Sequence, residues 1–370
     1  MSKAAELANL IGNINAGGGG VNRNLIINGA MNVAQRATSA TGLGSADGYF
    51  VLDRWHSTLG ATSGGRFTLT QDSSAPSGFA NSAKLACTTA DTSVAAGEVL
   101  LFRQKIEGQN VQAFAKGTSD AKPFALSFYV KGNASATYVG ALRDIDNDRY
   151  VGKTFSVTTD WTRVELSFPP DTTGALDDDN ASSLELWIWL HAGSTYTSGT
   201  LSTSWASYSN ANLAVGISSF FDSTDRTFFI TGVQLEVGQN PTSFEHISNF
   251  GEELARCQRY FQQWTQEASG FSTNNYAAVA DSVMHGDTLA FMQYTHPVQL
   301  RATPALTFNG NFVSNNASVD RALSSLQINT NTPYVTSFYG TIPDNNEGGQ
   351  AGFMRANNDG DASIFFDSEL

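Results

Sequence analysis

Aromatic side chains in loop-like stretches are the residues of this sequence best suited to hold a ligand. Trp and Tyr rings stack on the C–H faces of sugars, and loops present such rings well. We therefore predict a glycan site among Tyr196, Trp205 and Tyr208 of the stretch GSTYTSGTLSTSWASYSN, with Tyr276, Tyr334 and Tyr339 in the C-terminal part. The alternative for each ring is local packing beneath a long loop. Trp161, Trp187 and Trp189 fall in strand-like stretches, and we interpret them as core or sheet-face residues.

Two acidic clusters have the composition of metal sites. Asp144, Asp146 and Asp148 alternate as the ligands of a calcium loop do, but the Gly and the distal Glu of an EF-hand are missing. The cluster lies between two strand-like stretches, where Asp and Asn commonly form turns, so a polar hairpin turn is the preferred interpretation. The second cluster, residues 177–180 (DDDN), is more typical of a solvated loop. We predict neither a metal nor any other cofactor.

Enzyme motifs are missing from the sequence. It contains no Gly-x-Ser-x-Gly elbow, no His-Glu-x-x-His zinc site and no Gly-x-x-x-x-Gly-Lys phosphate loop. The five histidines, at positions 56, 191, 246, 285 and 296, show no metal-ligand spacing. No pair of acids stands out as the two carboxylates of a glycosidase. These observations predict a protein without catalytic activity.

The composition favours an all-β binding or structural protein. Charged residues make up only 15% of the chain, while Gly, Ser, Thr and Phe are abundant. The net charge of −13 argues against nucleic acid or an anionic membrane as the main partner, since both attract clustered Lys and Arg. We expect no membrane insertion, because no run of about 18 apolar residues is present.

Cysteine usage and the first residues bear on the compartment. The two cysteines, Cys87 and Cys257, are too few for a disulfide framework, and buried thiols are the preferred interpretation. The N-terminus lacks the apolar core of a signal peptide, so we expect synthesis in a cytoplasm without secretion of the chain.

Short strands with alternating polarity are expected between residues 24 and 237. Phe124–Lys131 and Thr162–Phe168 alternate most clearly, and Leu184–His191 is apolar on both faces, as in a covered central strand. Further strands are predicted at Arg66–Gln71, Lys84–Thr88, Val99–Ile106, Ala136–Leu142 and Phe229–Val237. About ten strands without a helical period indicate a jelly roll or β-sandwich.

The stretch from Phe228 to Trp264 changes from a strand period to a helical period. Phe229, Thr231, Val233, Leu235 and Val237 are predicted to share one strand face. Residues 238–241 (GQNP) break the strand and are expected to let the chain leave the sandwich. A connector helix is predicted from Phe250 to Trp264, and its wide apolar arc suggests contact between three copies. The residues proposed for that contact are Leu254, Cys257, Phe261 and Trp264.

Both ends of the chain have features of their own. Leu7, Leu10, Ile11 and Ile14 form one stripe of a short N-terminal helix, which a Gly17–Gly20 hinge follows. Such a helix needs a packing partner, so it is predicted to be an attachment arm; a disordered tail is the alternative. At the C-terminal end, strands at Leu289–Tyr294, Ala305–Phe308 and Ala362–Phe366 with Asn- and Gly-rich turns predict a second β unit.

Seven segments resemble the modular β-rich tail-fibre proteins of tailed bacteriophages. They are NLIINGAMNVAQR (24–36), DRW (53–55), DWTRVELSFPPDTTG (160–174), FFITGVQLEVGQNPTSFEH (228–246), GEELARCQRYFQ (251–262), HPVQLRATPALTF (296–308) and IFFDSEL (364–370). The resemblance covers nearly the whole chain from Asn24, and the block from Ile230 to Gln262 is its most specific part.

The resemblance implies an architecture and a role. The expected order is an attachment arm (1–21), a carbohydrate-binding-like jelly roll (22–248), a connector helix (249–265) and a β tip (266–370). It implies a homotrimer on a phage tail or capsid that binds host cell-surface polysaccharide, with other virion proteins held by the N-terminal arm. The alternatives are a capsid-associated short fibre or decoration protein without a specific ligand and, less favoured, a tailspike that cleaves polysaccharide. The resemblance carries no catalytic residues.

Overall fold

The computed structural model describes residues 3, 4, 8, 23–60, 64–247, 249–265, 277–286, 288–316, 319–342 and 349–370. The chain divides into two compact units, Met1–Glu253 with Leu370, and Leu254–Glu369. Leu7, Leu10, Ile11 and Ile14 of the predicted arm lie outside the described residues. No helix in the described part of the chain is both long and apolar enough to span a membrane.

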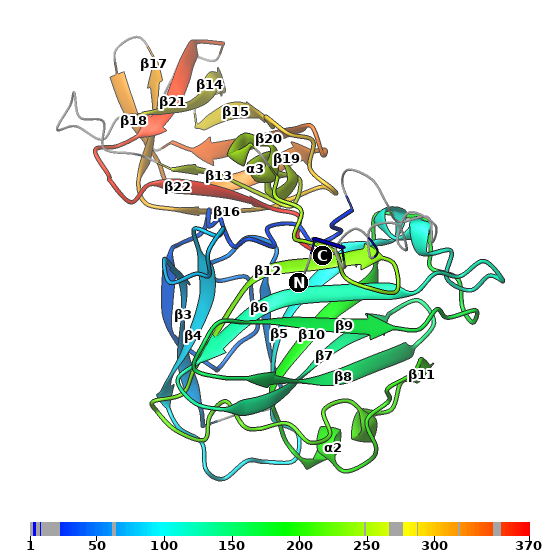
Figure 1. The fold of residues 1–370 in the computed structure, drawn as a ribbon. Helices are drawn as coiled ribbons and strands as arrows, with labels where there is room; N and C mark the ends of the chain where they lie inside the picture. Colours follow the sequence, from blue (N-terminus) through cyan, green and yellow to red (C-terminus); the bar gives the residue numbers. More distant parts are fainter. Residues whose placement is uncertain are drawn as a thin grey trace. The chain divides into compact units, whose positions relative to one another are not determined.

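The first unit is a sandwich of two six-stranded sheets (Figure 1), and every pairing recorded within them is antiparallel. The first sheet has the order β1 (Ser39–Leu43), β3 (Arg66–Asp72), β4 (Ser82–Thr89), β12 (Thr227–Val237), β6 (Phe124–Gly132) and β9 (Thr162–Phe168). The second has the order β11 (Ala206–Ser207), β8 (Arg149–Val157), β7 (Ala136–Asp144), β10 (Ser182–Ala192), β5 (Val99–Glu107) and β2 (His56–Gly60).

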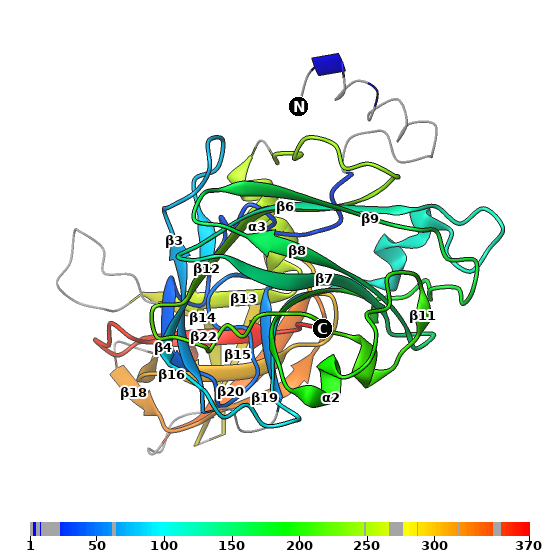
Figure 2. The same ribbon diagram turned by 60° about the horizontal axis from the view of Figure 1, so that its bottom comes forward.

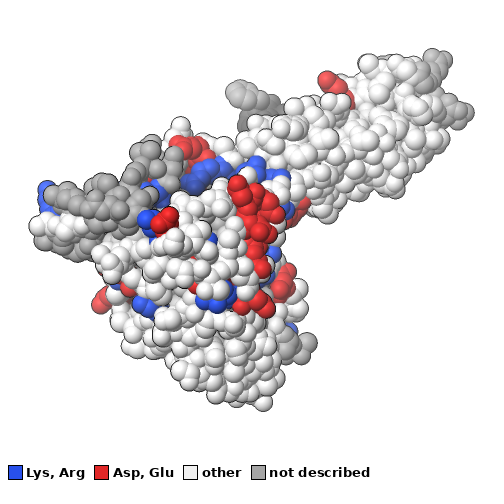
Figure 3. All heavy atoms as spheres, turned by 90° about the vertical axis from the view of Figure 1, so that its right-hand side faces the viewer, with Lys and Arg blue, Asp and Glu red and all other residues white. Residues whose placement is uncertain are grey.

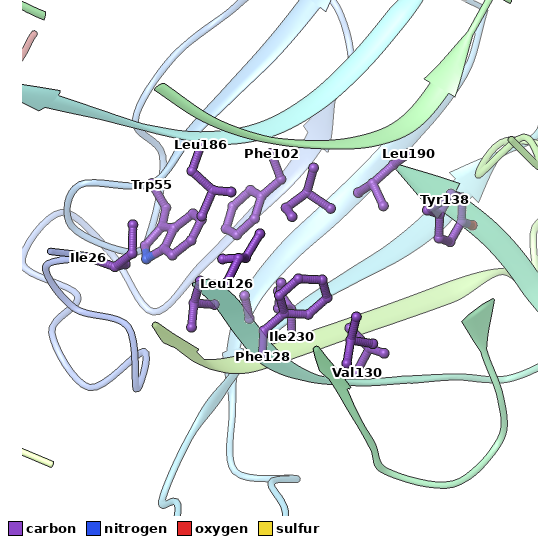
Figure 4. Close-up of a cluster of buried hydrophobic side chains, with 14 of the residues drawn as sticks. Ile26, Trp55, Phe102, Leu126, Phe128, Val130, Tyr138, Leu186, Leu190 and Ile230 are labelled. Carbon is purple, nitrogen blue, oxygen red and sulfur yellow. The ribbon is translucent and has the colours of Figure 1, made fainter. Parts of the chain in front are cut away.

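The core of this unit forms where the inward faces of both sheets meet. Trp55 stacks on Phe102 at 4.8 Å between ring centroids, while Phe128 packs edge-on against Phe155 at 5.0 Å. Figure 4 shows Leu186 and Leu190 of one sheet facing Leu126 and other side chains of the opposite sheet. Apolar burial on this scale is the main stabilising contribution in such a fold.

Short helices lie outside the sheets of the first unit. They are η1 (Gly108–Asn110), η2 (Gln112–Phe114), α2 (Ser194–Thr197) and η3 (Asn210–Asn212). The segment of residues 193–218, which holds α2 and η3, runs along the outer face of the second sheet (Figure 2). The hydroxyl of Tyr150 on β8 donates to the Leu213 carbonyl at 2.5 Å, and the Ala214 N–H donates to the Tyr196 carbonyl at 2.9 Å.

The second unit is also built from antiparallel strands. A three-stranded sheet has the order β13 (Phe261–Thr265), β22 (Ser363–Asp367) and β16 (Ala305–Asn309). A seven-stranded sheet has the order β18 (Val319–Leu323), β17 (Phe312–Asn316), β21 (Ala351–Ala356), β14 (Ala278–His285), β15 (Leu289–Thr295), β20 (Val335–Thr341) and β19 (Leu326–Asn331). Its core includes Met284, Met292, Phe338, Met354 and Phe366.

The predicted fold class, mainly β with a sandwich and a second smaller β unit, is confirmed, but the connector helix is shorter than predicted. Helix α3 spans Phe250–Gln258, with Glu252 and Glu253 in its first turn, where the helix dipole favours acidic side chains. The chain then turns and forms β13, which pairs with β22 from Phe261 to Thr265. Pairing of β13 with β22 outweighs the helical spacing of the apolar residues after Gln258, because this pairing lets the Phe261 ring stack on the Phe365 ring at 6.0 Å between centroids.

Candidate functional site

A bulge in β12 places Phe229 on the outer face of the first sheet. The pairing of β12 with β6 shifts register here, and Gly232 adopts a φ of 62°. The core-facing side chains are Phe228 and Ile230 before the bulge and Val233, Leu235 and Val237 after it. The prediction that Phe229 shares a face with Val233 is therefore wrong, because the extra residue of the bulge reverses the alternation.

Four side chains from neighbouring strands form a row on this outer face. Phe229 pairs across the sheet with Lys84 of β4 on one side and with Lys131 of β6 on the other. The Lys131 Nζ lies 4.7 Å from the Phe229 ring centroid and 5.3 Å from that of Trp161, which directly precedes β9. The Lys84 Nζ lies 5.4 Å from the Phe229 ring centroid. Trp161 meets the Phe229 ring edge-on at 6.1 Å.

A second group of rings begins two residues away on β6. Phe79 lies 5.4 Å from Tyr129, 5.0 Å from Phe244 and 5.0 Å from His246, between ring centroids. A Cβ on Gly232 would lie 2.7 Å from Phe79 Cζ and 3.0 Å from Tyr129 Cδ2, so both rings close onto bare backbone. We call the combined surface the outer aromatic face; its residues are Phe79, Lys84, Tyr129, Lys131, Trp161, Phe229, Phe244 and His246.

The segment after β12 bounds this face. The Thr242 N–H donates to Glu236 Oε1 at 2.7 Å, and the Glu245 N–H donates to Gln234 Oε1 at 2.7 Å. Gln234 and Glu236 belong to the outer face of β12 and are buried beneath this segment. Residues 238–241 were expected to let the chain leave the sandwich. Instead, the chain folds back across its own strand and brings the two rings of residues 244 and 246 to the face.

The two lysines of the row differ in their charge partners. Lys84 forms an ion pair with Asp72 at 3.4 Å. Lys131 donates to the Ser74 hydroxyl at 2.9 Å, and no carboxylate in the described ranges pairs with it. Trp161, Tyr129 and both lysines are half-buried. The face thus offers ring surfaces for stacking beside an ammonium group whose described contacts are a hydroxyl and two rings.

Two of the predicted glycan-binding aromatics pack against the sandwich. Tyr196 lies 5.5 Å from Trp189, and Tyr208 meets Trp187 edge-on at 6.3 Å. The Arg143 guanidinium covers the Tyr208 ring at 4.0 Å from its centroid. Burial raises the pKa of Tyr208, which keeps the phenol neutral. This geometry favours the packing alternative, since these rings seal the segment of residues 193–218 onto the second sheet.

Trp205 has a similar structural environment. Its ring lies 5.5 Å from Phe124, and its Nε1 donates to the Pro169 carbonyl at 3.0 Å. The Lys116 ammonium lies 5.2 Å from the ring centroid. Trp205 is therefore held by core and loop contacts, and it does not join the outer aromatic face.

The acidic cluster forms ion pairs in place of a calcium loop. Asp144 pairs with the buried Lys116 at 2.5 Å, while Asp148 pairs with Arg143. Asp146 accepts a backbone N–H at 2.9 Å. In the described ranges no group of three or more His, Cys, Asp or Glu side chains is placed to hold a metal ion. The hairpin-turn interpretation fits this geometry, because β7 and β8 pair directly on either side of the cluster.

The two described tyrosines of the set predicted in the second unit, Tyr334 and Tyr339, have different environments. Tyr334 is 59% exposed in the turn between β19 and β20. Tyr339 lies on β20, where its ring is 5.4 Å from Phe291 and its hydroxyl donates to Gln327 Oε1 at 2.6 Å. Tyr276 lies outside the described residues. Tyr334 is thus the exposed one of this predicted set.

The residues predicted to join three copies are largely used within the chain. Cys257 and Phe261 are buried, and Leu254 and Trp264 are half-buried. Trp264 packs against Phe312 at 6.0 Å between ring centroids. Packing inside the second unit therefore accounts for these four residues, since part of the predicted helix is strand β13, and contact between three copies stays a prediction.

Within the described residues, a Ser–His–Glu chain with a buried histidine and glutamate has the residue types of a catalytic triad. His191 Nδ1 lies 2.8 Å from Ser219 Oγ, and Nε2 lies 3.1 Å from Glu98 Oε2. Burial lowers the pKa of His191, although Glu98 opposes this effect. The Ser219 hydroxyl also accepts the Phe221 N–H at 3.1 Å, which closes a local turn. Because His191 and Glu98 are buried, we interpret this set of hydrogen-bonded side chains as structural.

Charged side chains are unevenly distributed on the face of the protein shown in Figure 3. In the view of Figure 3, they gather in patches, and most of the visible surface carries none. This distribution agrees with the low charged fraction of 15%. Contacts on such a surface depend on rings, hydroxyls and single charges more than on broad electrostatic attraction.

Similarity to known proteins is found at the level of the fold. No family model and no curated protein matches the sequence. Among solved structures, the chain is similar to a family 4 carbohydrate-binding module (TM-score 0.28, 12% identity, 57% of this chain and 97% of that chain). It is also similar to the family 11 carbohydrate-binding module of a Clostridium thermocellum cellulosomal cellulase (TM-score 0.27, 15% identity, 56% of this chain and 98% of that chain). A third similar structure is TmCBM61 in complex with β-1,4-galactotriose (TM-score 0.31, 9% identity, 58% of this chain and 99% of that chain). Identities and TM-scores this low transfer neither a ligand nor binding residues to this chain.

Proposed function

We propose that this protein binds a glycan on the outer aromatic face. The observation that carries the proposal is the row on the outer sheet face in which the half-buried Lys131 lies between the half-buried Trp161 and the buried Phe229. The half-buried indole of Trp161 provides a surface for the apolar face of a sugar ring, and Lys131 and Ser74 provide polar contacts for its substituents.

The competing location is the group of loop aromatics Tyr196, Trp205 and Tyr208. Their rings already pack on Trp189, Phe124 and other side chains, so a sugar would have to displace protein contacts. Lys131 and Phe229 lie on strands and Trp161 directly precedes β9, and strands hold a binding surface more rigidly than loops do. The exposed Tyr334 offers a separate contact in the second unit.

A glycan array tests the proposed face. We expect the wild-type protein to bind a subset of bacterial surface polysaccharides, and Trp161→Ala to lose that binding by roughly tenfold or more, because one stacking platform is removed. Tyr208→Ala is the matched control, since it removes an aromatic from the opposite sheet. Circular dichroism checks that both variants fold. Loss of binding in Tyr208→Ala with retention in Trp161→Ala would place the site under the loop, and binding of no glycan by the wild type would contradict the proposal.

We also propose that binding is the whole activity and that no bond is cleaved. His191 and Glu98 of the Ser219–His191–Glu98 chain are buried and Ser219 is half-buried, and this supports the proposal. Incubation with a bound polysaccharide, followed by size-exclusion chromatography, is expected to leave the polymer length unchanged. A decrease in polymer length would favour the depolymerase alternative.

We further propose that the chain is a receptor-binding tail-fibre protein of a tailed phage, assembled in the host cytoplasm and carried on the virion. The support is the resemblance of the seven sequence segments together with the glycan-binding face. Deletion of residues 1–20 is expected to leave folding intact and to abolish incorporation into particles. Normal incorporation of the deleted protein would contradict the role of the arm. Incorporation without any glycan binding by the intact chain would favour a decoration protein.

A further inference from the structure

We infer that the glycan on the outer aromatic face is acidic, and that Lys131 binds the carboxylate of a uronic acid unit. This inference rests on the proposed function and adds the chemical class of the ligand. Lys131 is thereby assigned as the residue that distinguishes acidic from neutral sugars at this face.

The surroundings of the Lys131 ammonium leave its charge unbalanced. Its contacts are the Ser74 hydroxyl at 2.9 Å and the rings of Phe229 and Trp161 at 4.7 and 5.3 Å. Ring faces attract a cation, but they do not neutralise it as a carboxylate does. Partial burial between two rings also excludes water and strengthens any charge-assisted hydrogen bond made there.

Lys84 provides the comparison within the same row. Its ammonium also lies over the Phe229 ring, at 5.4 Å, but Asp72 neutralises it at 3.4 Å. Arg163, on the neighbouring strand β9, is likewise neutralised by Glu165 at 2.6 Å. Of these three cations on the outer side of the sheet, Lys131 is the one whose described contacts include no acid.

The geometry fits one anionic group on one sugar unit. A uronic acid stacked on Trp161 carries its carboxylate at the ring edge, within reach of an ammonium beside the indole. Nucleic acid is a poorer match, because it requires many cations along a groove and the whole chain has a net charge of −13. A repeating acidic polysaccharide needs only one correctly placed cation for each bound unit.

The test compares acidic glycans with matched neutral forms. The probes are an array of uronate-bearing bacterial polysaccharide fragments, each printed beside the form in which its carboxyl groups have been reduced to alcohols. We expect wild-type binding to the acidic forms and roughly tenfold or greater loss on the reduced forms. Lys131→Met, which keeps the apolar stem, is expected to bind acidic and reduced forms equally weakly, and Lys131→Arg to restore preference for the acidic forms.

Lys153→Met is the matched control, since its ammonium also lies near an aromatic ring, that of Phe168 at 6.0 Å, but belongs to strand β8 of the second sheet, outside the outer aromatic face. It is expected to retain the preference for acidic forms. Equal binding of acidic and reduced forms by the wild type, or an unchanged preference in Lys131→Met, would overturn the inference while the glycan-binding function stands. Binding to no glycan would overturn both. Binding to single-stranded DNA on the same array, in place of the glycans, would also overturn both.

Discussion

Gly232 is the residue on which the shape of the outer aromatic face most depends. Its φ of 62° lies in the left-handed region, where residues with a Cβ are strained. The Phe79 and Tyr129 rings occupy the space that a Cβ would need. One residue therefore fixes both the bulge in β12 and the approach of two rings to the sheet.

Substitution of Gly232 by Ala is expected to lower the free energy of unfolding by about 1–3 kcal/mol, because backbone strain adds to contact with the two rings. Urea denaturation measures the change. Gly216→Ala is the matched control, since Gly216 also has a positive φ, 86°, with nothing within 4 Å of an added Cβ. A loss in Gly216→Ala as large as that in Gly232→Ala would show that the rings exert no constraint.

His296 makes the second unit sensitive to acid. Burial lowers the pKa of His296 from 6.5 to about 4. The neutral ring is held by two hydrogen bonds, between Nδ1 and Gln262 Oε1 at 3.0 Å and between Nε2 and Thr336 Oγ1 at 2.9 Å. The unfolded chain takes up a proton near pH 6.5, whereas the folded chain does so only near pH 4. The stabilisation is therefore present above pH 6.5 and is lost as the pH falls from about 6.5 to about 4.

Hydrogen exchange in the peptides of β15 and β20, corrected for intrinsic rates, is expected to show lower protection at pH 5 than at pH 7. His296→Gln should reduce this pH dependence, because Gln does not titrate. His285→Gln, at an exposed position of the same unit, is the control and should leave it unchanged. An identical pH dependence in wild type and His296→Gln would exclude His296 as the cause.

At the scale of elements, the long alternating segments were predictable from sequence and the irregular ones were not. Phe124–Gly132 and Thr162–Phe168 form strands as expected, because hydrophobic residues on one face alternate with polar or smaller residues on the other along each segment. Strand β8, Arg149–Val157, and the Asn-rich strands of the second unit were missed because their polarity alternates weakly. The bulge of β12 was missed because a strict two-residue period ignores an inserted residue.

The candidate site was only partly visible in the sequence for a related reason. Trp161, Lys131 and Phe229 belong to separate segments, and only sheet pairing brings them together. Trp161 was assigned to the core or a sheet face, which matches its half-buried position but did not suggest binding. The glycine at position 232, within an otherwise regular strand pattern, is the local signal that could have indicated the bulge.

Lys116 forms ion pairs that link the end of β7 to the loop after β9. Its buried ammonium contacts Asp144 at 2.5 Å and Asp171 at 3.1 Å. Burial tends to raise the pKa of Asp171, but hydrogen bonds from Arg149, the Thr173 N–H and Lys116 outweigh this effect and lower it. The ion network thus joins the β7–β8 hairpin to the loop after β9.

Lys116→Met is expected to lower the free energy of unfolding by about 3 kcal/mol, because two buried carboxylates lose a cation. Urea denaturation measures the change. Lys84→Met is the comparison, since the pair of Lys84 with Asp72 is partly exposed and is expected to contribute less than about 1 kcal/mol. A comparable loss in both variants would show that burial does not increase the contribution of the Lys116 network.

At the scale of the whole molecule, two units with separate cores share one chain. The second unit has exposed apolar side chains at Val283, Phe308, Val319, Ile328 and Phe353. Exposed apolar side chains are typical of surfaces that contact other molecules. These residues are better candidates for contact between copies than Leu254, Cys257, Phe261 and Trp264, which are buried or half-buried within the chain.

We expect the protein to be a trimer in solution, with a mass near three times 39.5 kDa. Light scattering coupled to size-exclusion chromatography at micromolar concentration measures the mass. Val283→Asp is expected to weaken the trimer if this strand face contributes to it, with Thr58→Asp in the first unit as control. A monomer in the wild type would contradict the expected oligomeric state.

The bulge at Gly232 also determines which sequence changes strand β12 can accept. The bulge shifts the alternation of β12, so that Phe229 lies on the outer face of the sheet while Val233, Leu235 and Val237 face the core. A substitution at Phe229 therefore changes the outer face and leaves the core contacts of the other three residues in place. Insertion or deletion of a single residue at this point would exchange interior and exterior along half of the strand. A point substitution on the outer face therefore leaves the core residues of β12 in place, whereas a change in length at this point would displace them.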